Sequence, residues 1–124
     1  MAATVADMDA AGLAATGAGQ GEPLVVDVLY IDGCPNHESF LPHLRELLGS
    51  RGVSARVRLV HVGSDEDAQR LRFLGSPSVR IDGRDVEPGA DGREGYGLQC
   101  RLYRTSRGVS GTPDDAWILA ALSP

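Results

Sequence analysis

The chain has 124 residues and a formal net charge of −5, and this length predicts a single domain. All 12 basic residues are arginine and they are scattered, so the sequence offers neither a nucleic-acid-binding patch nor a lysine for Schiff-base or P-loop chemistry. No run approaches the ~20 apolar residues of a membrane span, and the first residues lack the basic and apolar stretches of an export signal. We therefore expect a cytoplasmic protein that binds neither nucleic acid nor a membrane. The heavy use of Ala, Gly and Arg suggests a bacterial origin.

The first half of the chain predicts a tail, two strands and a helix. Residues 1–22 are mostly Ala, Gly, Asp and Thr without apolar periodicity, which predicts a flexible tail before one domain over residues 23–124. Leu24–Ile31 is apolar enough for a strand buried on both faces. Asn36–Leu48 has the spacing of an amphipathic helix, and Ala55–Val62 alternates like a second strand.

The second half predicts a short helix, a hairpin and a last helix. Ser64–Asp67 is typical of a helix start, and Ser78–Glu87 of two short strands around a Gly-Arg turn. A Gly-rich loop, Pro88–Gly95, precedes a stretch that alternates over residues 98–103. Thr112–Asp115 begins the last helix with a cap, a proline and two acids. This order favours an α/β protein with a mixed sheet.

The most informative motif is Gly33-Cys34-Pro35-Asn36-His37, which joins the first strand to the first helix. A thiol at the first turn of a helix lies near unpaired N–H groups and the positive end of the helix dipole, which favour the thiolate. Cys34 is therefore a candidate nucleophile, with a buried structural cysteine as the alternative. His37, one turn further on, either stabilises or deprotonates that thiol or is a solvated surface residue.

The element order, with a cysteine after the first strand and a proline before the hairpin, resembles the thioredoxin fold, a three-layer α/β sandwich. Cys34 matches the family's first active-site cysteine, and Pro42 matches the proline within its active-site helix. Ser76-Pro77 matches the family's cis-proline, which faces the catalytic sulfur. This resemblance covers Leu24–Glu87 and the last helix. It implies a cis peptide bond that leaves the Ser76 backbone free to bind a substrate strand.

The sequence also departs from the thioredoxin pattern. His37 stands where the family has its second cysteine, so Cys34 has no dithiol partner at that position. The family's buried acid has only Asp27 as a counterpart, one residue out of register and therefore on the opposite face of the strand. Dithiol chemistry between positions 34 and 37 is excluded.

A second resemblance rests on Gly95–Arg104, a segment without a thioredoxin counterpart that forms a Gly-rich insertion before the last helix. Together with Leu74–Pro77 and the Cys34 motif, it is similar to small bacterial thioredoxin-fold proteins labelled alkylmercury lyase-like. Organomercurial lyases cleave a carbon–mercury bond with two cysteines and an aspartate. The resemblance implies Cys34 and Cys100 as the two thiolates.

Cys100 has two alternative roles. On a strand it shares an apolar face with Leu98 and Leu102, which predicts a buried side chain. If the Gly-rich loop folds back over the start of the first helix, Cys100 becomes the resolving thiol or the second metal ligand. Arg101 and Arg104 would then make its surroundings electropositive.

Two further sets of polar residues are candidates for chemistry. A zinc site on Cys34 and His37 would need further ligands, because structural zinc has four. Only three other side chains could complete it: His43, His61 and Cys100. Four acids near the motif, the hairpin and the loop are either solvated charges or a proton donor for carbon–mercury cleavage: Asp32, Asp85, Glu87 and Asp91.

The sequence supports three functional hypotheses. In the first, which we favour, Cys34 attacks a disulfide, and Cys100 or glutathione resolves the mixed disulfide. In the second, Cys34 and Cys100 hold mercury or an organomercurial, because thiolates are soft ligands. In the third, the protein is a non-enzymatic adaptor whose Tyr96–Tyr103 segment binds a partner. None of the three needs a cofactor, and the oligomeric state is left open.

Overall fold

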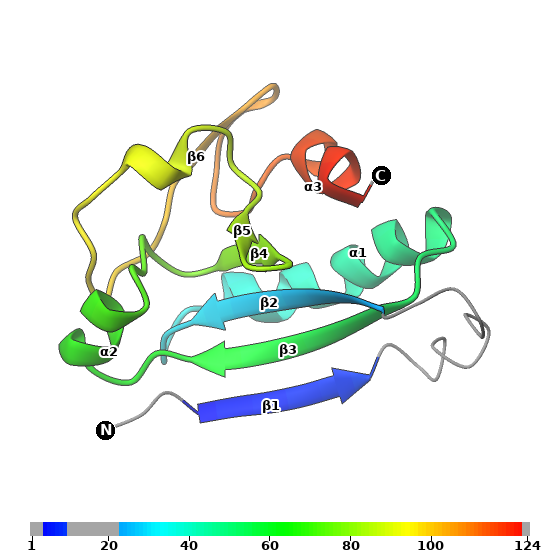
Figure 1. Ribbon diagram of the computed structural model, residues 1–124. Coiled ribbons are helices and arrows are strands. Elements are labelled where there is room, and N and C mark those ends of the chain that lie inside the picture. The colour runs from blue at the N-terminus through cyan, green and yellow to red at the C-terminus, as the bar shows by residue number, and fades with distance from the viewer. Residues whose placement is uncertain (1–3, 10–22, 123–124) are drawn as a thin grey trace.

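The structure is a computed structural model that describes residues 4–9 and 23–122 (Figure 1). Its main sheet has five strands in the order β1-β3-β2-β4-β5. The central β2 and β3 are parallel, and all other neighbours in the sheet are antiparallel. The five strands are β1 (Thr4–Asp9), β2 (Leu24–Tyr30), β3 (Ala55–His61), β4 (Ser78–Ile81) and β5 (Arg84–Asp85).

Two helices pack on one face of this sheet. They are α1 (Asn36–Ser50), which continues through Pro42, and α3 (Asp115–Leu122), and the two helices contact each other. Strand side chains alternate between faces, so every second residue of β2, β3 and β4 joins these helices in one cluster. We call this cluster the apolar core; it includes Val26, Val28, Phe40, Leu44, Val57, Val79, Ile81, Ile118 and Leu122.

A smaller cluster lies on the opposite face of the sheet. It is built around the short helix α2 (Asp65–Arg70), whose start is capped by the Ser64 side chain, which accepts a hydrogen bond from Asp67 N at 3.1 Å. The strand residues that point away from α1 meet this helix. The buried members of the cluster are Leu29, Val60, Val62, Ala68 and Phe73.

The prediction of an α/β protein with a mixed sheet is confirmed. The predicted flexible tail needs a correction, because residues 4–9 form β1, which pairs antiparallel with β3. Without β1, the edge of β3 would present unpaired N–H and C=O groups, and a backbone can pair with such an edge whatever its side chains. Residues 1–3 and 10–22 of the predicted tail lie outside the described residues.

The segment before the last helix also differs from the prediction. Instead of a strand through residues 98–103, the chain makes one isolated bridge at Cys100 and then a separate hairpin. This hairpin, β6 (Tyr103–Thr105) and β7 (Gly108–Ser110), forms its own two-stranded sheet. A 3₁₀ turn at Ala90–Gly92 lies within the predicted Gly-rich loop.

Candidate functional site around Cys34 and Ser76

Cys34 lies between the end of β2 and the first turn of α1, as predicted. Gly33 before it has φ +79°, a left-handed conformation that favours glycine. Pro35 after it is the N-cap residue of α1, and the helix begins at Asn36 as predicted. The Cys34 side chain is 2% exposed, and its Sγ donates a hydrogen bond to the Ser76 carbonyl at 3.7 Å. The sulfur is therefore held against the segment that precedes β4.

The Ser76-Pro77 peptide bond is cis, as the resemblance implied. Its backbone is not free, however, and this expectation was wrong. Ser76 N donates to Gln99 O at 2.8 Å, and Ser76 O accepts from Arg101 N at 3.0 Å. These two bonds form an isolated parallel bridge between Ser76 and Cys100. Residues 97–102, which we call the bridging segment, thus occupy the position that a substrate strand was expected to take.

Both cysteines therefore meet at Ser76. Cys34 reaches it through its sulfur, and Cys100 pairs with it through the backbone; both thiols are free. The face assignment of Cys100 was wrong, because its side chain is exposed together with Leu98 and Leu102. Arg101, between Cys100 and Leu102, points inward, whereas Gln99, between Leu98 and Cys100, is exposed. The predicted apolar face is therefore exposed, and on the opposite face Arg101 and Tyr103 are buried.

His37 lies on the first turn of α1 and is partly buried. Its Nδ1–H donates to the Cys34 carbonyl at 2.6 Å, and its ring stacks on Tyr30 with 4.2 Å between centroids. Because the other partner is a carbonyl, Nδ1 must carry the proton, which leaves Nε2 as the basic nitrogen. The imidazole thus orients the backbone beside the sulfur and does not bond to the sulfur itself.

The predicted zinc ligands do not come together. Among the described residues, no group of three or more His, Cys, Asp or Glu side chains is arranged to hold a metal ion. His43 Nε2 lies 2.7 Å from Asp115 Oδ1. His61 Nε2 is 3.0 Å from Asp32 Oδ2, an ion-pair distance without hydrogen-bond geometry. The three histidines therefore have separate partners: Asp115 for His43, Asp32 for His61 and the Cys34 carbonyl for His37.

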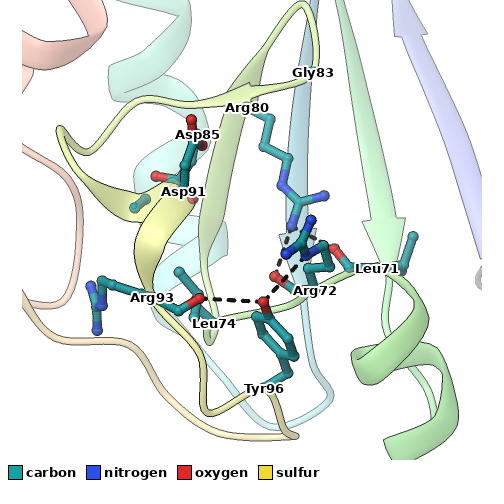
Figure 2. A pocket seen from close by; sticks show the side chains of 10 residues that line it. Leu71, Arg72, Leu74, Arg80, Gly83, Asp85, Asp91, Arg93 and Tyr96 are labelled. Atoms are coloured by element: carbon teal, nitrogen blue, oxygen red, sulfur yellow. Dashed lines mark hydrogen bonds between the residues drawn. The ribbon is translucent and has the colours of Figure 1, made fainter.

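The four candidate acids have different surroundings. Asp32 is the exposed partner of His61, and Asp91 lies on the wall of a cavity that Asp85 also lines (Figure 2). Asp85 and Glu87 are largely buried and form ion pairs with Arg101. For these two residues the prediction of solvated charge was wrong.

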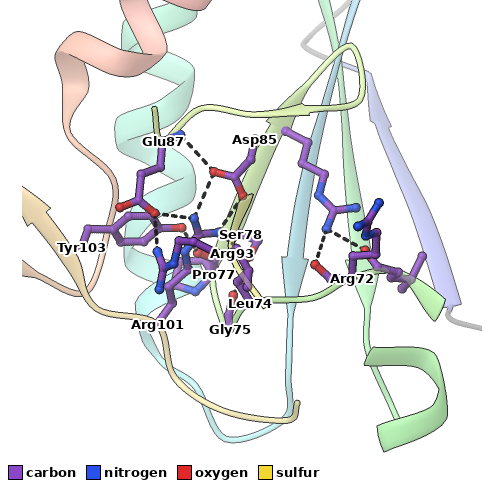
Figure 3. A network of polar contacts seen from close by, with 12 residues as sticks. Arg72, Leu74, Gly75, Pro77, Ser78, Asp85, Glu87, Arg93, Arg101 and Tyr103 are labelled. Carbon is purple, nitrogen blue, oxygen red and sulfur yellow. Dashed lines mark hydrogen bonds and ion pairs between the residues drawn. The ribbon is translucent and has the colours of Figure 1, made fainter. Parts of the chain in front are cut away.

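The sequence suggested Arg101 only as a cation near Cys100, and its buried ion pairs were not predicted. Its side chain is 1% exposed, and Nη1 donates to Asp85 Oδ2 at 2.7 Å and to Ser78 Oγ at 2.9 Å. Nη2 donates to Asp85 Oδ1 at 3.1 Å and to Glu87 Oε1 at 2.7 Å (Figure 3). The guanidinium carbon also lies 4.5 Å from the centre of the Tyr103 ring. We call these five residues the Arg101 network.

The network fixes the bridging segment on the β4–β5 hairpin. Burial alone lowers the pKa of Arg101, but the carboxylates of Asp85 and Glu87 outweigh it and raise that pKa, so the cation persists. Burial raises the pKa of Tyr103, whose neutral hydroxyl donates to Pro77 O at 2.5 Å. A Cβ on Gly75 would lie 2.8 Å from Arg101 Cβ, so only glycine permits this approach.

Comparison of the chain with protein-family models, with curated proteins and with solved structures found no match. Within residues 4–9 and 23–122, no helix is both long and apolar enough to cross a membrane. The two family resemblances noted in the sequence therefore stay predictions, and the functional argument rests on the geometry around Ser76.

Proposed function

We propose that this chain is a reactive-thiol protein in which Cys34 is the nucleophile of thiol–disulfide exchange and Cys100 is the second thiol. The observation that carries this proposal is that both cysteines contact Ser76, Cys34 through its sulfur and Cys100 through its backbone. Paired backbones lie about 4.8 Å apart, so Cys100 is a direct neighbour of the residue that the Cys34 sulfur contacts. We place the protein in the cytoplasm, where thiols are kept reduced.

A thioredoxin-like fold is part of this proposal. The order β2-α1-β3-α2-β4-β5-α3, with a parallel β2–β3 pair and an antiparallel β4–β5 hairpin, supports it. So do the two clusters, which lie on opposite faces of the sheet and suggest a three-layer sandwich. In this interpretation β1 and the segment from Gly95 to Ser110 are additions to the family's layout.

The proposed reaction has two exchange steps. The Cys34 thiolate attacks one sulfur of a substrate disulfide, a mixed disulfide forms, and the other substrate sulfur leaves as a thiolate that takes up a proton. The Cys100 thiolate then attacks Cys34 Sγ and releases the second substrate thiol. The substrate gains two electrons and two protons, and the protein ends with a Cys34–Cys100 disulfide. An external thiol such as glutathione would reduce this disulfide and restore the protein.

Access to Cys34 requires movement of the bridging segment. Cys34 is 2% exposed, and both backbone groups of Ser76 are bonded to residues of that segment. We propose that the segment leaves Ser76 when substrate arrives, which exposes Cys34 while Cys100 stays on the moving strand. At rest, Cys100 is the thiol that reagents reach first.

The test measures reduction of a small aromatic disulfide by the wild type, Cys34→Ser and Cys100→Ser. We expect Cys34→Ser to lose turnover and Cys100→Ser to accumulate a mixed disulfide on Cys34, detected by intact mass. Mild oxidation of the wild type should remove two hydrogens, and neither variant should show that loss. Unchanged turnover in Cys34→Ser rejects the proposal and favours the adaptor hypothesis, which the exposed Leu98 and Leu102 support.

Mercury binding is a second candidate that the same two free thiols support. Two thiolates are a sufficient ligand set for a soft ion. We propose binding alone and not carbon–mercury cleavage, because Asp85 and Glu87 are held in ion pairs with Arg101. One mercuric ion per chain should bind to the wild type, with much weaker binding in each cysteine variant. Equal affinity in all three proteins contradicts a two-thiol site.

A further inference from the structure

A cavity of about 210 Å³ lies between the end of α2 and the β4–β5 hairpin, and neither cysteine lines it (Figure 2). Its walls include the side chains of Arg72, Arg80 and Tyr96. Figure 2 shows the guanidinium groups of the two arginines close together at one end of the cavity. Two neighbouring positive charges repel each other. We therefore ask which negative charges offset the repulsion between Arg72 and Arg80.

Arg80 carries a charge that no ion pair offsets in the described part of the chain. Its register partner on β2, Asp27, is held by Arg58 at 2.6 and 3.0 Å, and Asp85 is held by Arg101. Arg80 donates only through Nη2, to Leu71 O at 2.7 Å and Arg72 O at 3.1 Å. Burial lowers its pKa, as expected for a desolvated cation, although the charges of Asp85 and Asp27, outside ion-pair distance, partly oppose this shift.

Arg80 also has a structural role that does not use all its donors. By bonding to the carbonyls of Leu71 and Arg72 it satisfies backbone acceptors just beyond the last turn of α2 and screens the negative end of that helix. Both bonds come from one nitrogen, so Nε and Nη1 have no hydrogen-bond partner among the described residues. A guanidinium with free donors on a cavity wall is a group that binds anions.

Arg72 occupies a backbone position that favours glycine. It follows the C-cap of α2 with φ +55°, and the bonds Arg72 N to Gln69 O and Phe73 N to Ala68 O give the helix end a Schellman geometry. Its Nε donates to Tyr96 Oη at 3.2 Å, and that hydroxyl donates to the Arg93 carbonyl. Arg72 forms no ion pair among residues 23–122. An arginine at this strained position therefore directs a cation at the cavity, and this cation is offset only by carboxylates outside ion-pair distance, Asp91 and Glu94.

We propose that this cavity binds a small oxyanion, a phosphate or sulfate group, between Arg72 and Arg80. Arginine pairs with such groups through parallel N–H···O bonds. The volume is below the ~300 Å³ at which pockets begin to hold drug-sized ligands, so a single anionic group fits better than a large molecule. Asp91 and the paired Asp85 also line the wall and favour a ligand held at the arginine end. This proposal is independent of the thiol chemistry.

The test titrates the wild type with inorganic phosphate and with sulfate against chloride at matched ionic strength, by thermal unfolding and calorimetry. We expect a saturable rise in Tm and saturable heats with phosphate or sulfate only. Arg72→Gly should fold at least as stably without ligand, because glycine prefers the left-handed conformation, yet bind about tenfold or more weakly. Arg51→Gln, the same charge change at the exposed end of α1, should bind like the wild type.

Two outcomes overturn the proposal. One is the absence of any saturable difference between phosphate or sulfate and chloride. The other is Arg72→Gly binding as tightly as the wild type. If the site binds, an organic phosphate monoester titrated beside inorganic phosphate identifies the source. Tighter binding of the monoester indicates the phosphate group of a metabolite, and tighter binding of the inorganic ion indicates the free anion.

Discussion

The apolar core and the Arg101 network lie on neighbouring parts of the same sheet but are stabilised by different forces. The core packs aliphatic side chains of α1 and α3 on β2, β3 and β4, and its stability comes from removing apolar area from water. The network holds the bridging segment through one buried cation and two carboxylates. Buried ion pairs of this kind lose their hydration, and they stabilise the fold only while all the charged partners are present.

This difference bears on the candidate site, because Cys34 lies at the boundary between the two regions. Its sulfur contacts Ser76, whose backbone carries the bridging segment that the Arg101 network fastens. Loss of the core should unfold the whole domain. Loss of the network should release the bridging segment first, because its remaining attachments are a few hydrogen bonds. We therefore expect the apolar core to control global stability and the Arg101 network to control access to the Cys34 thiol.

Arg101→Met should give the largest effect. The substitution removes the cation, so the largely buried carboxylates of Asp85 and Glu87 lose their ion pairs with Arg101. We expect this loss to lower the free energy of unfolding by about 3 kcal/mol. It should also increase the rate of Cys34 alkylation in native buffer, well before global unfolding. Urea unfolding and time-resolved mass spectrometry after alkylation measure the two effects.

The matched control is Arg104→Met, the same substitution at an exposed position on β6. It should change the free energy of unfolding by less than about 0.5 kcal/mol. If Arg101→Met alkylates Cys34 no faster than this control, the network does not govern access to the sulfur.

Leu44→Ala should destabilise by a comparable amount but with a smaller effect on access to Cys34. Leu44 is 0% exposed in the apolar core, and truncation of a buried leucine costs about 2–5 kcal/mol. Because the bridging segment stays fastened, alkylation of Cys34 should rise only as far as the globally unfolded population rises. If Leu44→Ala alkylates Cys34 faster than an equally stable Arg101→Met protein does, the apolar core and the Arg101 network do not differ in their control of access to Cys34.

The same distinction explains how far the sequence could predict the structure. The core elements follow from apolar periodicity, since the spacing in Asn36–Leu48 and the apolar run in Leu24–Ile31 indicate which faces are buried. The position of Cys34 before a helix follows from the glycine and proline beside it. These are local signals, and the structure agrees with them.

The bridging segment could not be oriented from local signals. A period of two shows that its faces differ, but not which one is buried, and the apolar face is usually chosen. Here Asp85 and Glu87 on the distant hairpin make burial of Arg101 favourable, and this reverses the choice. The hydrogen bonds of the Ser76 backbone to the bridging segment and the pairing of β1 with β3 likewise join residues far apart in the sequence. A short sequence pattern does not encode such contacts.

Leu102→Ser should give the smallest effect and tests this orientation directly. Leu102 is 68% exposed beside the buried Arg101, so its loss should change the free energy of unfolding by less than about 0.5 kcal/mol. The orientation expected from the sequence predicts instead a loss of ~2 kcal/mol or more, the cost of removing a buried leucine. Urea unfolding distinguishes the two values, and a large loss would place the Leu98–Leu102 face inside. Cys100 would then be buried, and this would contradict the proposal that Cys100 is the accessible second thiol of the resting protein.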